Sequence, residues 1–246
     1  MVQPRRFCDC DASEKALYSA FLVLVGLGYL MALSYLYFSF QGLDGKAGLS
    51  VDDVAENYYG NRSGTRLEAA LRGPMSAFSD IENKRIIISW LQSGAEEKFF
   101  KQDVLPILKK DCFQCHGGAS AQNFVGIDLS NFNAVKKLAD VDTGVSLHSL
   151  MRISHIHLFG IALILLAVGM IFRRVEMREW LKTLLILLPF ISIFVDILAW
   201  FVTKWDPVFA YSIVIAGGLL GFSLSAQILI SLYQIWFWRG GEAVRK

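Results

Sequence analysis

Hydrophobic residues are concentrated in four long blocks that carry almost no charge. The first block covers residues 16–40, and three more cover residues 150–172, 183–203 and 208–238. A helix needs about 20 mainly apolar residues to cross the roughly 30 Å hydrocarbon layer of a bilayer. Each block has that length, and the first is too long to be the core of a signal peptide. The pattern therefore predicts four transmembrane helices.

The short segments between the blocks indicate the direction in which the helices cross the membrane. Lysine and arginine in short loops favour the cytoplasmic side. Ten basic residues fall on the side shared by the two termini and the connector between the second and third blocks, whereas Lys204 and Arg152 fall on the other side. We therefore expect residues 1–15 and 239–246 to be cytoplasmic and residues 41–148 to lie outside the cytoplasm.

The composition agrees with a membrane part and a separate polar part. The chain is 54% hydrophobic and 19% charged, whereas soluble domains are about 25% charged. Its 24 basic and 22 acidic residues give a net charge of +2, which argues against the strong positive field that binds nucleic acid. The sequence predicts an all-α protein in which a mainly helical domain, residues 41–148, is inserted between the first membrane helix and a three-helix membrane part, residues 149–238.

The inserted domain contains Cys112-Phe113-Gln114-Cys115-His116, the C-x-x-C-H pattern of covalent haem attachment. Two thiols on one helical turn can reach the two vinyl groups of a haem, and His116 then lies under the iron as its axial ligand. A redox disulfide or half of a zinc site are the alternatives. The insert has no further cysteine, however, and its other histidine is His148. We therefore expect one covalent haem c, with His116 as the proximal metal ligand.

The segments on both sides of this motif resemble those of small cytochromes c. Residues 99–111 are similar to the helix that precedes the haem motif in that family, and residues 126–139 are similar to what often follows it. The resemblance covers about 45 residues. It implies a membrane-anchored monohaem c-type cytochrome. The second half of the family fold does not follow the motif, because the chain enters the membrane near Leu150.

We hypothesise that this missing half lies upstream of the motif, as a circular permutation. Residues 67–75 resemble the methionine-bearing loop of the family. Residues 79–91 resemble its final helix, with Ser79 or Asp80 as the N-cap and Gly94 as the C-cap. Such a permutation is feasible because the first and last helices of that fold pack together, so that a short link can join them.

The circular permutation makes Met75 the expected distal ligand of the haem iron. His148, Met151 and His155 are competing candidates. Met75 could also be a buried side chain with no ligand role. The axial ligand sets the redox potential, so spectra and potentials distinguish these candidates.

Two ionisable residues within the membrane blocks are further candidates for function. His157 and Asp196 each lie about seven residues from the outer end of their block, which places both roughly 10 Å deep. They could form a structural pair, accept protons at a quinol site, or belong to a metal or non-covalent haem site. Cys8 and Cys10 lie on the predicted cytoplasmic side, where thiols stay reduced, and are interpreted as an incidental pair.

The function expected from these features is electron transfer by a covalent haem c at the periplasmic face of a bacterial cytoplasmic (inner) membrane. One haem carries one electron, so the chain needs a redox donor protein and an acceptor protein. Three membrane helices beyond a simple anchor favour docking with other subunits of a respiratory or oxidoreductase complex. An electron-transfer subunit is thus expected rather than a self-contained enzyme. The alternative is a quinol-oxidising membrane dehydrogenase that passes electrons to its own haem c.

Overall fold

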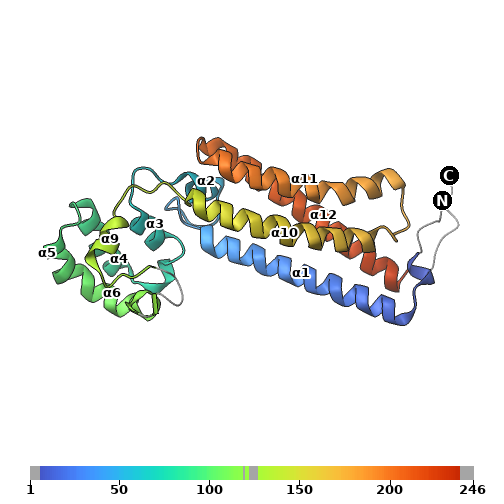
Figure 1. Ribbon diagram of the computed structural model, residues 1–246, viewed down its shortest axis with the longest axis horizontal. Coiled ribbons are helices and arrows are strands. Elements are labelled where there is room, and N and C mark those ends of the chain that lie inside the picture. Colours follow the sequence, from blue (N-terminus) through green and yellow to red (C-terminus); the bar gives the residue numbers. More distant parts are fainter. Residues whose placement is uncertain (1–5, 119, 122–126, 239–246) are drawn as a thin grey trace. The chain divides into compact units, whose positions relative to one another are not determined.

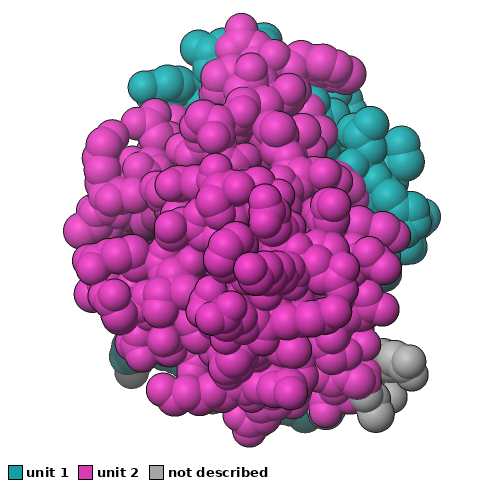
Figure 2. All heavy atoms as spheres, turned by 90° about the vertical axis from the view of Figure 1, so that its left-hand side faces the viewer, with its two compact units in different colours: residues 1–36, 147–203, 208–246 teal, residues 37–146, 204–207 magenta. Residues whose placement is uncertain are grey.

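The computed structural model describes residues 6–118, 120–121 and 127–238 (Figure 1). Across these ranges the regular structure is helical, apart from one isolated bridge between Thr65 and Val141. The chain divides into two compact units, which Figure 2 colours separately. We call residues 1–36, 147–203 and 208–246 the membrane unit, and residues 37–146 and 204–207 the insert unit. The expectation of an all-α fold is confirmed for the part of the chain that the structure describes.

The membrane unit is built from four long helices. These are α1 (Ala12–Phe40), α10 (Leu147–Phe172), α11 (Glu179–Thr203) and α12 (Ala210–Trp236), the last preceded by the 3₁₀ turn η4 (Pro207–Phe209). All four are long and apolar enough to cross a bilayer. The protein is therefore a membrane protein, and the prediction of four candidate transmembrane helices is confirmed.

Three of these helices begin three or four residues before the apolar blocks that predicted them. Hydropathy marks the segment that fits the hydrocarbon layer, whereas a helix continues through polar residues wherever its first amides find acceptors. At the start of α1, Asp11 Oδ1 accepts a hydrogen bond from Glu14 N at 2.8 Å, and Asp11 N donates to Glu14 Oε2 at 3.3 Å. The earlier start of α10 places His148 in its first turn rather than in the inserted domain.

Buried amide side chains join α12 to α11 and to the connector between α10 and α11. Gln227 donates from Nε2 to Leu185 O at 2.9 Å. Gln234 pairs with both backbone groups of Glu176, accepting from N at 2.8 Å and donating to O at 3.0 Å. Both glutamines are buried. Polar groups within a membrane need such partners, so these bonds fix the register of the bundle.

Helix α1 runs antiparallel to α12. Near the start of α1, Ser19 Oγ accepts a hydrogen bond from Trp236 Nε1 at 2.9 Å. Further along, the Tyr29 hydroxyl faces Gly221, at a point where an added Cβ would collide with it. Small residues let helices approach closely in a membrane, so Gly221 determines how near α1 can come.

The insert unit consists of short helices. They are α2 (Val51–Tyr59), α3 (Arg66–Arg72), α4 (Ile81–Gln92), α5 (Glu97–Phe99), the π-helical turn η3 (Phe100–Val104), α6 (Leu105–Asp111), α7 (Phe113–His116) and α9 (Phe132–Lys137). The loop residue Lys204 also belongs to this unit. Its ammonium group donates to Tyr58 O, Thr143 O and Val145 O at 3.0, 2.8 and 2.7 Å.

Residues 67–75, interpreted from the sequence as a loop, are helical as far as Arg72. Thr65 Oγ1 accepts a hydrogen bond from Glu68 N at 3.2 Å and so caps α3. Met75 lies in the turn after this helix, at the start of the 3₁₀ turn η2 (Ser76–Phe78). The loop interpretation was therefore wrong for most of the segment, because Thr65 supplies the cap that starts a helix here.

The helix predicted at residues 79–91 is α4. Of its two candidate N-caps the structure uses Asp80, whose Oδ1 accepts from Asn83 N at 2.8 Å. At the other end Ser93 is the C-cap, and Gly94 follows it with φ +100°. That left-handed backbone conformation favours glycine, which explains the chain reversal at this point.

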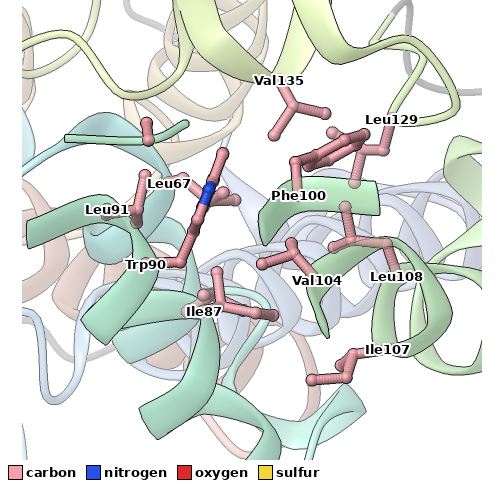
Figure 3. Close-up of a cluster of buried hydrophobic side chains, with 12 residues drawn as sticks. Leu67, Ile87, Trp90, Leu91, Phe100, Val104, Ile107, Leu108, Leu129 and Val135 are labelled. Carbon is pink, nitrogen blue, oxygen red and sulfur yellow. The ribbon is translucent and has the colours of Figure 1, made fainter. Parts of the chain in front are cut away.

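The core of the insert unit lies between α4 and the continuous helical segment α5–η3–α6 (Figure 3). Ile87 and Trp90 of α4 meet Phe100 and Leu108, and all four are nearly inaccessible to solvent. The rings of Trp90 and Phe100 lie 5.6 Å apart. Leu129 and Val135 from the segment after the motif complete the cluster. The helix before the motif is thus packed on both sides.

Candidate haem attachment site

The three motif residues lie on one tight helical turn. Helix α6 ends at Asp111, and α7 begins at Phe113, so that Cys112 alone lies between the two helices. The backbone amides of Cys115 and His116 both donate to Cys112 O, at 3.2 and 2.9 Å. Both cysteines are free thiols; Cys112 is half-buried and Cys115 is exposed. The turn thus presents two thiols and one imidazole from a single short segment.

The imidazole of His116 is oriented by the backbone that follows the motif. Its Nδ1 lies 3.2 Å from Ile127 O, and Leu129 N donates to His116 O at 2.8 Å. A ring that donates from Nδ1 to a carbonyl carries its lone pair on Nε2. Histidines that bind metals commonly have such a partner, which fixes both the tautomer and the ring plane. With Nδ1 directed to this carbonyl, Nε2 is the ring nitrogen of His116 that could bind a metal ion.

The surroundings of Cys112 favour its protonated form. Burial raises the pKa of this thiol, and the neighbouring Asp111 carboxylate raises it further. The thiolate is the species that attacks disulfides and electrophiles. A raised pKa therefore lowers the fraction of Cys112 that is present as the reactive thiolate.

A series of hydrogen bonds connects the Met75 turn to the start of the motif. Lys84 of α4 donates to Ser76 O at 2.8 Å. One residue earlier, Asn83 donates from Nδ2 to Asp111 Oδ2 at 2.9 Å, and Asp111 directly precedes the first motif cysteine. The half-buried Met75 therefore lies on a segment that is hydrogen-bonded, through α4, to the end of α6.

The other candidate distal ligands occupy the membrane unit. His148, Met151 and His155 all belong to α10, whereas Met75 belongs to the same unit as the motif. His155 turns its Nδ1 towards Arg152 O at 3.1 Å. Of the four candidates proposed from the sequence, Met75 is the one that the insert unit contains.

Several apolar side chains near these groups are exposed. Phe78 and Ile81 lie beside the Met75 turn, and Ile127 provides the carbonyl that orients His116. An apolar cofactor needs such a surface together with a few well-placed polar groups. The two thiols and the imidazole of the motif turn, together with the Met75 thioether elsewhere in the same unit, are the donor types that a covalently bound haem uses.

The two membrane residues selected from the sequence are joined by a third. Trp200, one turn after Asp196 on α11, donates a hydrogen bond to the Asp196 carboxylate. The His157 ring packs against Trp200 with 5.5 Å between centroids, and its Nδ1 lies 2.9 Å from Ile153 O. Tyr29 of α1 lies within electrostatic range of Asp196. Trp200 and Tyr29 were not selected from the sequence, where aromatic residues in membrane blocks are too common to stand out.

Comparisons with known proteins bear on the membrane part. A family model described as a transmembrane helical domain matches residues 120–242, which is half of the chain. The matched range contains α9, α10, α11 and α12; the haem motif and α1 lie outside it. No curated protein and no solved structure matches the chain.

Proposed function

The chain belongs to the Aq_1264_TM family of transmembrane helical domains, and we propose that it is a membrane-bound monohaem electron carrier. The proposal assigns one haem c to the insert unit, bound covalently through Cys112 and Cys115 with His116 as the proximal ligand. A haem bound there would supply a one-electron redox couple. The chain would then connect a donor protein to an acceptor protein, as a subunit of a respiratory or oxidoreductase membrane complex.

The orientation of His116 carries this proposal. Its Nδ1 is directed to Ile127 O, which leaves Nε2 available on a turn that also holds two free thiols. A redox disulfide would need only the thiols and would give no role to a fixed imidazole. The packing of α4 against the helix before the motif supports a cytochrome c-like arrangement of the insert unit.

Met75 is the proposed distal ligand. Its turn is hydrogen-bonded through Lys84 and Asn83 of α4 to the end of α6. A thioether ligand raises the reduction potential relative to a second imidazole. We therefore propose histidine–methionine ligation by His116 and Met75.

The proposed location is the periplasmic face of a bacterial cytoplasmic membrane, with both termini in the cytoplasm. Basic residues in the short connector after α10 support this orientation, because such residues are retained on the cytoplasmic side. In this orientation the insert unit and its haem would lie in the periplasm. The redox partners of the carrier must then reach the haem from that side of the membrane.

A redox titration of the purified full-length chain tests the proposal. We expect haem absorbance that titrates as one single-electron couple and that persists after acid extraction of non-covalent haem. The double variant Cys112→Ala/Cys115→Ala should lose this persistence, whereas Cys8→Ala/Cys10→Ala, a matched loss of two thiols in the membrane unit, should keep it. Full persistence in the double motif variant would exclude attachment at this site.

Quinol oxidation in the membrane unit is the second candidate function. The grouping of Tyr29, Asp196, Trp200 and His157 favours it, since Asp196 and His157 could accept the two protons that a quinol releases. A short-chain quinol should then reduce the haem of the isolated chain, and Asp196→Asn should abolish this reduction while dithionite still reduces the haem. Asp206→Asn, outside the membrane helices, is the control. If quinol fails with the unmodified chain, the electron-carrier subunit remains the assignment.

A further inference from the structure

An apolar groove lies between α1 and α10. It is at the end of α10 that leads into the connector to α11, and Figure 1 shows the course of these two helices. Leu17 and Phe21 line it from α1, and Ala167 and Met170 line it from α10. The groove has a volume of about 400 Å³. It is separate from the haem motif and from the His157–Asp196 group, so the proposed function does not explain it.

The groove follows from the side chains on the two facing helices. Residues 167, 170 and 174 share one face of α10, because side chains three and four positions apart line up along a helix. Ala167 is too small to fill the space opposite Phe21. Leu17 and Met170 remain 66% and 56% exposed, within helices that could span a bilayer. The groove therefore opens toward the surface that lipid would cover.

Arg174 closes one end of the groove. Its guanidinium carbon lies 5.2 Å from the centre of the Tyr18 ring, and Nη1 donates to Cys10 Sγ at 3.5 Å. In the described part of the chain no carboxylate lies within ion-pair distance of Arg174, and the nearby Glu176 pairs instead with Arg6 at 3.6 Å. A guanidinium has five N–H donors, so most of those on Arg174 remain available to an anion.

We propose that this groove binds one anionic phospholipid. An acyl chain would lie along Leu17, Phe21 and Ala167, and the headgroup phosphate would bind Arg174. Ala167 and Arg174 are seven positions apart, which corresponds to about 10 Å along a helix and is enough for the upper part of an acyl chain. Guanidinium groups bind phosphate with paired, charge-assisted hydrogen bonds. Basic pockets between membrane helices are recognised sites for anionic headgroups.

The occupant would also complete the packing of α1. In the described residues of that helix, Leu22 is the one side chain that is buried. A lipid between α1 and α10 adds apolar contacts to both helices without a change in the protein. Lipid binding should therefore stabilise the folded chain by mass action.

Binding can be measured on the delipidated full-length chain in detergent, with phosphatidylglycerol and phosphatidylcholine as the two probes. Native mass spectrometry gives the fraction of chain that carries each lipid, and thermal unfolding gives the stabilisation. We expect one phosphatidylglycerol to bind in preference to phosphatidylcholine. Arg174→Gln should weaken phosphatidylglycerol binding about fivefold, the factor expected for one lost basic contact at a membrane surface.

Two matched controls distinguish lipid binding in the groove from non-specific lipid binding elsewhere on the surface. Arg173→Gln removes the same charge from an exposed neighbour that does not line the groove, and should change binding little. Ala167→Phe should block the acyl chain, whereas Ala162→Phe, at an exposed position of the same helix, should not. Equal losses in the two arginine variants, or equal binding of the two lipids, would overturn the proposal. So would full binding by Ala167→Phe, or occupation of the groove by a second copy of the chain.

Discussion

Asp111 links two parts of the candidate haem site at the scale of single residues. Its carboxylate accepts hydrogen bonds from Ser79 Oγ at 2.7 Å and from Asn83 Nδ2 at 2.9 Å, which connects α6 to the segment after Met75. The same negative charge lies next to Cys112 and raises the pKa of its thiol, in addition to the larger effect of burial. One side chain thus influences both the position of the Met75 segment and the reactivity of a motif cysteine.

Asp111→Asn should accelerate alkylation of Cys112 in the chain produced without haem attachment. The substitution removes the charge that helps to raise the pKa, so a larger fraction of Cys112 is thiolate at pH 8. Peptide mass spectrometry after timed exposure to iodoacetamide gives the rate at each cysteine. Asp103→Asn, also a loss of one acid in the helical segment before the motif, serves as the control. Equal Cys112 rates in Asp111→Asn and the unmodified chain would contradict the assigned influence of Asp111.

Met75→Ala should lower the reduction potential of the haem and remove the spectral signature of a thioether ligand. Axial ligands set haem potentials over a range of about 0.8 V, and a thioether lies at the high end relative to imidazole. A potentiometric titration measures the change. Met151→Ala, His148→Ala and His155→Ala, which alter the competing candidates, should leave the potential nearly unchanged. A large shift in one of these variants instead would identify that residue as the ligand.

At the scale of helices, sequence patterns predicted the long elements better than the short ones. The four membrane helices follow from hydropathy alone, and α4 follows from the resemblance of residues 79–91 to a capped helix, in which apolar side chains such as Ile87 and Trp90 recur at helical spacing. Helices α2 and α3 were not predicted, because helices this short depend on caps and tertiary contacts. Their signals were nonetheless present: Ser50 and Asp53 form a reciprocal capping box, and Thr65 precedes Glu68 at the same spacing.

Gly221→Ala should destabilise the membrane unit, whereas Gly217→Ala should not. An added Cβ at Gly221 collides with the Tyr29 hydroxyl, so either the Tyr29 side chain or α1 itself must shift; a Cβ at Gly217 meets nothing within 4 Å. Alanine otherwise favours a helix over glycine by roughly 0.5–1 kcal/mol, so Gly217→Ala should be neutral or stabilising. Thermal unfolding of the full chain in detergent compares the two. Tyr29→Phe in the Gly221→Ala background should recover part of the loss, and equal stability of the two alanine variants would argue against close packing at this position.

For the whole molecule, the sequence indicated which segments belong to the membrane but not which helix faces meet. A helix that is apolar all around gives no signal for its rotation, and the four membrane helices are of this kind. The contact of Trp200 with both His157 and Asp196, and the groove closed by Arg174, both depend on that rotation. The haem motif, in contrast, was visible in the sequence because its chemistry needs a fixed local spacing. The backbone partner of its histidine, Ile127, required the structure.

The proposed orientation of the whole chain can be tested through the exposed thiol of Cys8. A membrane-impermeant maleimide should label Cys8 in inverted membrane vesicles and not in intact spheroplasts. Ser63→Cys, at an exposed position of the insert unit, should show the opposite pattern. Cys8 precedes α1 in the sequence and Ser63 follows it, so a helix that crosses the membrane once places the two positions on opposite sides of the membrane. Each position is therefore the control for the other. Labelling of Cys8 in intact spheroplasts would contradict a cytoplasmic N-terminus.

The intact mass of the purified full-length chain, produced together with a haem c maturation system, tests the central claim most directly. The account predicts one species that exceeds the 27.6 kDa polypeptide by the mass of one haem and keeps that mass under denaturing conditions. Digestion should then place the added mass on the peptide that contains Cys112 and Cys115. A chain that acquires no covalent haem under these conditions, while a known c-type cytochrome in the same cells does, would contradict the proposed function.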